Sequence, residues 1–181
     1  MINKLNVSNI FNNKMIINKE EIELLKKTED YYGARGEYFF NKKTIKYEQH
    51  YNDKYKLDSN SVYDCVECEG QTIDNINING KKLVIISTAV WGSYPEVIEI
   101  VTKSGIKEKK EIYFKDWYFG ETNWSQDNYV NNIFATGRDI ETNSNHYIYI
   151  NEIDIIELGE IKKIILPYNP DIIIFGVYIE N

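Results

Sequence analysis

Short apolar runs alternate with turn residues over the last two thirds of the chain. These runs have strand length and are rich in β-branched and aromatic residues, which favours β-strands over helices. The predicted strands are Leu83–Val90, Val97–Thr102, Glu111–Phe114, Tyr147–Ile156, Ile161–Leu166 and Ile172–Ile179. Turns containing glycine are predicted at Lys103–Gly105 and Leu158–Glu160. The pattern predicts a β domain of six or seven strands with short connections.

The spacing between the runs also predicts how the strands pair. None of the connections has the length of a helix that would return the chain for parallel pairing, so an antiparallel β-sandwich is expected. A tight corner is expected at Pro167–Pro170, between the last two strands. The exception is Trp117–Asn145, which is weakly periodic and reads as one long loop. Loops of this length inside a compact domain are usually functional or disordered.

The first third of the chain has a different pattern. Residues 1–17 mix apolar residues with Asn and Lys, which fits either a strand-like lead-in or a loosely docked arm. Asn18 precedes acidic residues and an apolar spacing at Ile22 and Leu25, so it predicts the start of a short helix that ends near Gly33. With 181 residues, the chain fits one domain and an added arm. We therefore expect an arm over 1–54, packed on or part of the sandwich, and a β-sandwich domain over 55–181.

The charge is distributed unevenly along the chain. Its 21 basic and 28 acidic residues give a net charge of −7, but the first 57 residues hold 11 basic and 8 acidic side chains. The larger, acidic part would repel a phosphate backbone, because nucleic-acid affinity depends on cationic neutralisation. Nucleic acid is therefore not expected as a partner.

The amino-terminal residues contain no apolar signal region. No segment approaches the roughly 20 apolar residues that span a bilayer. The sequence therefore predicts no membrane association and a cytoplasmic location.

Five short motifs, taken in order, resemble a known family. They are Cys68–Ile73, Leu83–Val90, Phe114–Trp117, His146–Tyr149 and Leu166–Pro170. Residues 55–181 resemble the non-catalytic, galactose-binding-like β-sandwich domains attached to bacterial glycoside hydrolases that act on mannosides and related sugars. The resemblance implies a jelly roll of two antiparallel sheets, with a role in structural support or sugar contact. It leaves residues 1–54 unexplained.

Aromatic residues in two loops are the candidate ligand contacts. Sugars bind by stacking their C–H faces on aromatic rings while polar side chains hold the hydroxyl groups. The predicted binding residues are Trp91, Tyr94, Asn123, Trp124, Asp127, Arg138 and Asp139. The aromatic members of this set fit ligand contact and packing equally well, whereas Trp117 is expected in the core.

Catalytic and redox chemistry have weaker signals. Cys65 and Cys68 form a C-x-x-C, but no second ligand pair follows, and strand positions three apart face opposite ways, so two ordinary buried thiols are expected. Asp116 and Asp139 each have a neighbouring glutamate, which leaves a glycosidase-like acid pair open. A Ser/His/Asp or Cys/His site at His50 or His146 also stays open, although packing is expected for His146.

Calcium is the cofactor that the residues could hold. Hard oxygen ligands gather at Asn52, Asp53, Asp58 and Asn60, and again over 127–132, although no EF-hand loop is present. A structural calcium ion is therefore an open expectation, and no other cofactor is predicted.

The sequence thus favours a non-catalytic, carbohydrate-binding β-sandwich module. One alternative is a structural or protein-interaction protein that uses the exposed aromatic loops and the amino-terminal arm. A second alternative is a small glycan hydrolase that acts through Asp116 or Asp139.

Overall fold

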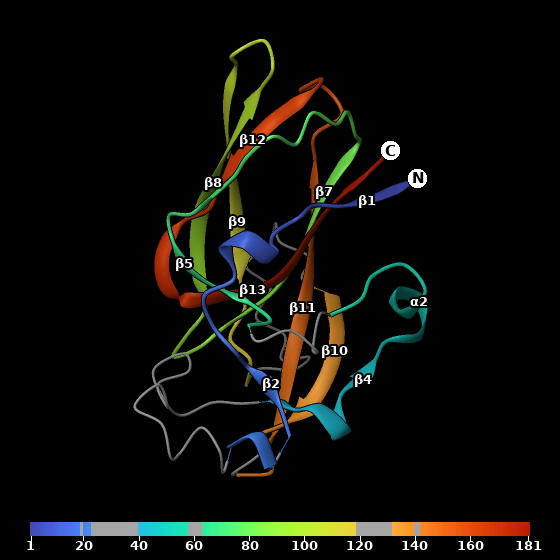
Figure 1. Cartoon of the computed structure of the whole chain (residues 1–181), viewed down its shortest axis with the longest axis vertical. Helices are drawn as coiled ribbons and strands as arrows, with labels where there is room; N and C mark the ends of the chain where they lie inside the picture. The colour runs from blue at the N-terminus through green and yellow to red at the C-terminus, as the bar shows by residue number, and fades with distance from the viewer. Residues whose placement is uncertain (19, 23–39, 58–62, 119–131, 140–141) are drawn as a thin grey trace.

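The computed structural model describes residues 1–18, 20–22, 40–57, 63–118, 132–139 and 142–181 (Figure 1). The strands are β1 (Ile2–Lys4), β2 (Ile16–Ile17), β3 (Phe40–Asn41), β4 (Lys46–Tyr47), β5 (Val66–Glu69), β6 (Thr72–Ile73), β7 (Lys82–Ala89), β8 (Tyr94–Thr102), β9 (Lys107–Phe114), β10 (Asn132–Arg138), β11 (Asn145–Asp154), β12 (Ile161–Ile165) and β13 (Tyr168–Glu180). The helical segments are η1 (Ser8–Ile10), η3 (Lys42–Thr44) and α2 (Gln49–Asn52).

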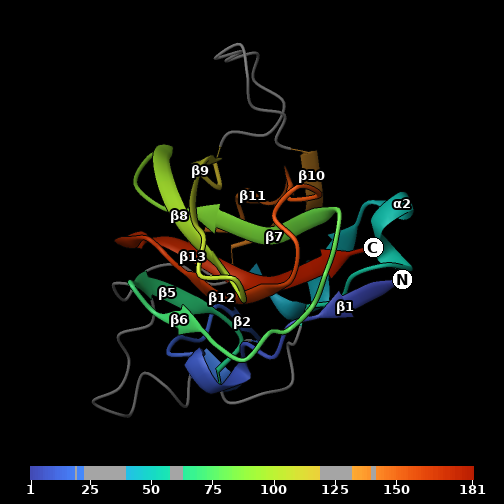
Figure 2. The same ribbon diagram turned by 90° about the horizontal axis from the view of Figure 1, so that it is seen from above.

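Two antiparallel sheets form the body of the molecule. The larger has the strand order β1-β13-β7-β11-β10-β4, with β5 also paired to β13, and the smaller has the order β6-β12-β8-β9. The pair β2 and β3 is parallel and separate from both. The sheets curl into a half-barrel, in which β8 and β9 lie across β7 and β13 (Figures 1 and 2). The expectation of a mainly β, antiparallel fold is confirmed.

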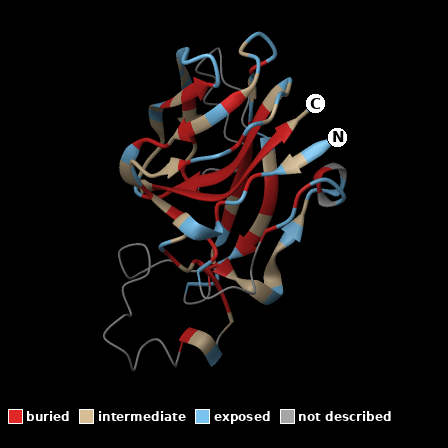
Figure 3. Cartoon of the chain, turned by 45° about the horizontal axis from the view of Figure 1, so that its top comes forward, coloured by how far each residue is buried: buried red, intermediate tan, exposed pale blue. Residues whose placement is uncertain are grey.

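The central strands read as continuous apolar runs because both faces of the larger sheet are covered. On one face, Leu83 and Ile85 of β7 belong to a core that includes Ile98 of β8 and Ile164 of β12. We call this the first core. On the other face, Val84 and other residues of the larger sheet belong to a second core. The second core also contains residues from the amino-terminal third: Met15, Ile16, Phe40, Tyr51, Tyr55 and Leu57. Figure 3 shows the central strands as almost entirely buried.

All six strands expected from the sequence are present, as β7, β8, β9, β11, β12 and β13. The two expected turns are also present, and Gly105 and Gly159 adopt φ values of 89° and 76° there, which favour glycine. The expected corner at Pro167–Pro170 is different. β13 already begins at Tyr168, and an irregular register with β5 between Asn169 and Ile173 takes the place of a separate corner.

The expectation of one long loop over Trp117–Asn145 is wrong, because β10 occupies residues 132–138. The alternation of apolar and polar residues along β10 is weak for two reasons. The register of β10 with β11 shifts between Ile133 and Ala135. In addition, Gly137 occupies a position that faces the core but has no side chain. Residues 49–52, a polar segment in sequence, form α2.

Residues 1–54 add strands and packing to the larger sheet. β1 pairs with β13, which places the two termini side by side (Figure 1), and β4 pairs with β10. The lead-in is therefore strand-like over Ile2–Lys4. At the predicted helix start, Asn18 Oδ1 accepts the Glu21 N–H, and the Glu21 carboxylate accepts the Asn18 N–H, which is a capping box. Residues 20–22 are helical, and the remainder of that expected helix lies outside the described residues. Within the described ranges, no helix is long and apolar enough to span a membrane.

Candidate ligand-binding site

One face of the larger sheet changes from apolar to polar as it passes from β7 to β10. The β7 residue Ile85, which belongs to the first core, lies opposite Asn151 of β11. Side chains alternate along a strand, so Tyr149 and Tyr147 extend the same face. The buried amide of Asn151 donates to Ser87 Oγ at 3.1 Å, and the buried hydroxyl of Tyr149 donates to the Asp116 carbonyl at 3.1 Å. Beyond them the face is no longer apolar.

The strand register places four further polar side chains beside Tyr147 on this face. Thr136 of β10 lies opposite both Tyr147 of β11 and Lys46 of β4. Arg138, two residues further along β10, lies opposite Asn145. Opposite residues in an antiparallel ladder point to the same side, as do residues two apart on one strand. Lys46 and Tyr147 are therefore on the same face, one strand apart, because β10 pairs with both of their strands.

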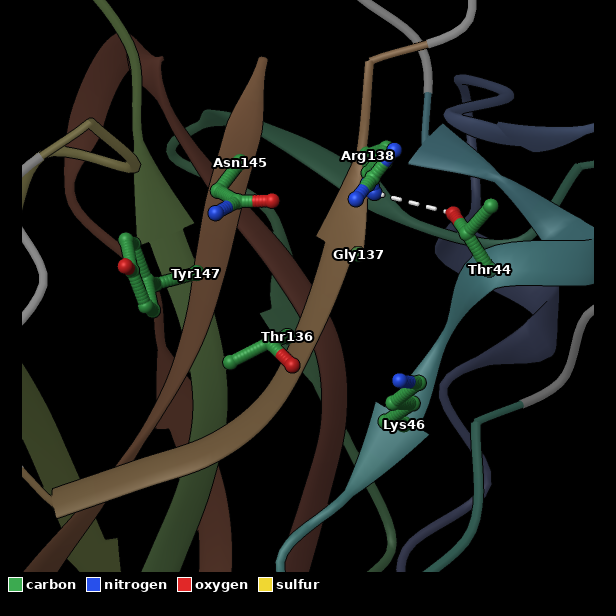
Figure 4. Close-up of a pocket in the computed structure, with 7 residues that line it drawn as sticks. All are labelled: Thr44, Lys46, Thr136, Gly137, Arg138, Asn145 and Tyr147. Atoms are coloured by element: carbon green, nitrogen blue, oxygen red, sulfur yellow. Dashed lines mark hydrogen bonds between the residues drawn. The ribbon is translucent and has the colours of Figure 1, made fainter. Parts of the chain in front are cut away.

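These side chains line a pocket of about 280 Å³. Its lining residues are Thr44, Lys46, Thr136, Gly137, Arg138, Asn145 and Tyr147 (Figure 4). Figure 4 shows that they come from three neighbouring segments, with β10 in the middle. We call this hollow the β10 pocket.

Hydrogen bonds hold the Arg138 side of the pocket in place. The Arg138 backbone N–H donates to Thr44 Oγ1 at 2.9 Å (Figure 4). The same hydroxyl donates to the Asn41 carbonyl at 2.9 Å. The Arg138 guanidinium donates one bond to Asn143 Oδ1 at 3.3 Å. The backbone of Arg138 is therefore anchored by Thr44, and its guanidinium group contacts Asn143.

The charge of the pocket is positive. Lys46 and Arg138 are its two ionisable cations, and no carboxylate residue is among its lining. Across the described residues, no carboxylate lies within 4.0 Å of either cationic group. In a chain whose net charge is −7, this pocket is a local cationic region.

A hydrogen-bonded chain of side chains lies beside the pocket. Asp139 Oδ1 accepts the Thr142 hydroxyl at 2.7 Å, Thr142 and Ser144 share a bond of 2.6 Å, and Ser144 Oγ contacts His146 Nε2 at 3.0 Å. His146 is fully buried, and its Nδ1 has no hydrogen-bond partner among the described residues. A serine–histidine contact is therefore present. The carboxylate binds Thr142, whereas in a Ser-His-Asp triad it would orient the histidine ring.

The predicted site residues lie in different environments. Trp91 follows β7, is 58 % exposed as a residue and has a φ of 65°. Tyr94 is partly buried, and its hydroxyl donates to Asp171 Oδ2 at 2.9 Å, so it anchors the start of β8. Arg138 lines the β10 pocket, whereas Asp139 is buried and holds the turn after β10. The predicted contacts Asn123, Trp124 and Asp127 lie outside the described residues.

Of the residues that line the pocket, only Arg138 is predicted from the sequence as a ligand contact, although part of the signal for the others is there. Thr136 and Arg138 are two apart, as are Asn145 and Tyr147, which is the spacing of side chains on one strand face. This spacing can be interpreted only if β10 is first recognised as a strand. Lys46 has no comparable sequence signal, because its position in the pocket depends on the pairing of β4 with β10.

Asp116 has a structural role directly after β9. Its carboxylate accepts the Tyr118 N–H at 2.8 Å, and its own N–H donates to Ser93 Oγ at 2.9 Å. Burial raises the pKa of Asp116, and backbone N–H groups oppose that rise. Glu121 and Glu141, the expected partners of the acid pairs, lie outside the described residues.

Trp117 and the two cysteines are core residues, as expected. Trp117 belongs to the second core and stacks on His146 with ring centroids 3.7 Å apart. Cys68 belongs to the first core and Cys65 to the second, so the two thiols point to opposite sides of β5, and burial raises the pKa of both. Among the described residues, no three His, Cys, Asp or Glu side chains gather as a metal site. Most of the oxygen ligands considered for calcium lie outside that part of the chain.

The chain was also compared with known proteins. No protein-family model matches it, and no curated protein matches it in sequence. Function is therefore inferred from the fold and from the β10 pocket.

Proposed function

We propose that the chain is a non-catalytic carbohydrate-binding module of the galactose-binding-like β-sandwich class, and that its ligand site is the β10 pocket. The observation that carries this proposal is the composition of that pocket. One tyrosine ring, two threonine hydroxyl groups, an amide and two cations line one hollow of about 280 Å³. An apolar ring with a few convergent polar groups is the usual composition of a sugar site.

Two further observations support a binding role without catalysis. The pocket lining contains no carboxylate, whereas glycoside hydrolysis normally uses two. Asp116 and Asp139, the acids considered for hydrolysis, each accept bonds that hold a local turn. The antiparallel sheets are compatible with the resemblance seen over residues 55–181.

The test is glycan binding by the intact chain. A glycan array would first identify binding oligosaccharides, and calorimetric titration would then measure their affinity. Tyr147→Ala is expected to weaken binding by about tenfold or more, because loss of a stacking ring removes on the order of 1 to 3 kcal/mol. Tyr168→Ala is the matched control, since Tyr168 is 80 % exposed and does not line the pocket.

Two alanine variants distinguish a ligand site in the β10 pocket from one at the exposed Trp91. If Trp91→Ala abolishes binding while Tyr147→Ala leaves it intact, the site is the turn after β7. An array without any bound glycan, at protein concentrations that detect weak lectins, would contradict the proposed function.

The protein-interaction alternative has one specific observation in its favour. Trp91 and Tyr118 are 58 % and 50 % exposed, and they lie in loops that are tied together by the bond from Asp116 N–H to Ser93 Oγ. Two exposed aromatic residues on adjoining loops suit a protein partner. Light scattering distinguishes the two functions. A self-associating chain would have a solution mass above that of the monomer, and Trp91→Ala would return the mass to that of the monomer.

A further inference from the structure

We infer that the β10 pocket selects glycans that carry an acidic group, either the carboxylate of a uronic acid or a sulfate ester. This inference rests on the proposed function and specifies its ligand class. It is carried by the two cations of the pocket, Lys46 and Arg138, which approach one hollow from neighbouring strands. Among the described residues neither cation has a carboxylate partner, and a neutral sugar would supply none.

Arg138 has the geometry of a carboxylate-binding residue. A guanidinium group presents five N–H donors in a planar fork, which matches the two oxygen atoms of a carboxylate. One donor contacts Asn143 Oδ1 at 3.3 Å, which leaves the charge of the guanidinium group and its other donors for an anion. The backbone of Arg138 is fixed by Thr44. A positioned cation loses little conformational entropy when an anion binds.

Lys46 provides the second charge from the edge strand β4. It lies opposite Thr136, so the ammonium group and the threonine hydroxyl border the same part of the pocket (Figure 4). Within the described ranges, Lys43 contacts Glu20, Lys82 contacts Glu152 and Lys103 contacts Glu160. Unlike these three lysines, Lys46 and Arg138 have no carboxylate within 4.0 Å among the described residues.

The neutral groups of the pocket fit the rest of a sugar ring. Tyr147 offers an aromatic surface, and Thr136 and Asn145 offer hydroxyl and amide groups for the sugar hydroxyls. The net charge of the chain is −7, so its overall field does not favour a long polyanion. An acidic sugar unit therefore has a defined place, whereas a long nucleic acid would meet repulsion.

The experiment compares paired probes by calorimetric titration of the full chain. Trigalacturonic acid is titrated against galactotriose, and a sulfated galactan against the same polymer after desulfation. The wild-type chain is expected to bind at least one acidic probe about tenfold or more tightly than its neutral partner. The acidic probe that binds more tightly identifies the carboxylate or the sulfate ester as the recognised group.

Variants then assign the selectivity to the pocket. Arg138→Gln and Lys46→Gln are each expected to lower affinity for the acidic probe by about tenfold, with little change for the neutral one. Arg138→Lys keeps the charge but removes the fork, so it is expected to weaken uronate binding more than sulfate binding. Lys162→Gln is the matched control, because Lys162 is an exposed lysine on β12 away from the pocket.

The outcomes separate this inference from the proposed function. Equal affinity of the wild-type chain for acidic and neutral probes would overturn the inference and leave sugar binding intact. An equal loss from Lys162→Gln and Arg138→Gln would also overturn it, since binding would then follow net charge. Absence of binding to every glycan would overturn the proposed function itself.

Discussion

His146 is completely buried. Histidine ordinarily gains a proton close to neutral pH, so burial affects which charge state it has in the folded protein. Its ring stacks on Trp117, with an interplanar angle of 7°, and Nε2 contacts Ser144 Oγ. Burial lowers the pKa of His146, and the nearby Asp139 carboxylate opposes that shift. The folded protein therefore keeps this imidazole neutral at neutral pH.

The stability of the fold should consequently depend on pH through His146. In the unfolded chain the imidazole takes up a proton near pH 6.5, whereas in the folded chain it does so at lower pH. Between these two values the unfolded state binds more protons. The contribution of His146 to the free energy of unfolding is expected to be constant above about pH 6.5 and to decrease below it, with a slope of at most about 1.4 kcal/mol per pH unit. Urea unfolding over this range measures the effect.

The remaining histidine provides the control for this measurement. His50→Gln should preserve the pH dependence, whereas His146→Phe, which retains an aromatic ring against Trp117, should reduce it. The ring pKa of His146 can also be read directly from its proton resonances. A folded-state value at or above 6.5 would contradict the expectation.

At the scale of elements, sequence patterns predict strands best where the environment of each residue is uniform. β7 and β13 lie between two cores, so almost every position is apolar and the runs are evident. β10 has an inward glycine, a register shift and polar residues on its pocket face, so no period is visible. Prediction of the site is limited in the same way. The residue type of Arg138 makes it a candidate, but the residues around it are brought there by the pairing of β10 with β11 and β4.

Gly137 shows why β10 lacks a regular pattern. A Cβ atom at this position would lie 2.9 Å from Cδ1 of Phe40, whose ring packs edge-on against Trp117, His146 and Phe175. Gly137→Ala is therefore expected to destabilise the fold by about 1 to 3 kcal/mol, because overpacking moves side chains and backbone. Strand propensity alone would favour alanine. Urea unfolding measures the difference.

A second substitution tests whether Phe40 is the cause. Phe40→Leu gives the inner face of β10 more room, so Gly137→Ala should cost less in that background than in the wild type. An equal cost in both backgrounds would mean that the clash with Phe40 is not responsible.

At the scale of the whole molecule, the larger sheet depends on the amino-terminal third for one of its two cores. Met15 and Ile16 belong to that second core, and the buried carboxylate of Asp64 fixes their backbone. Its two oxygen atoms accept the Met15 N–H at 2.8 Å and the Ile16 N–H at 3.0 Å, and Lys14 Nζ lies 3.0 Å from Oδ2. Segments on either side of the expected boundary at residue 55 therefore share one core. We expect them to unfold as one unit.

Asp64→Ala tests this expectation. The substitution removes the acceptor of two buried N–H groups and the buried partner of Lys14, so we expect a loss of about 3 kcal/mol. Urea unfolding followed by tryptophan fluorescence and by far-UV circular dichroism should shift by the same amount, because a cooperative unit has one transition. Glu160→Gln, which breaks the exposed pair with Lys103, should cost about 1 kcal/mol or less. If Asp64→Ala instead separated the two transitions, the amino-terminal third would be an independent arm and the second core would not stabilise the sheet.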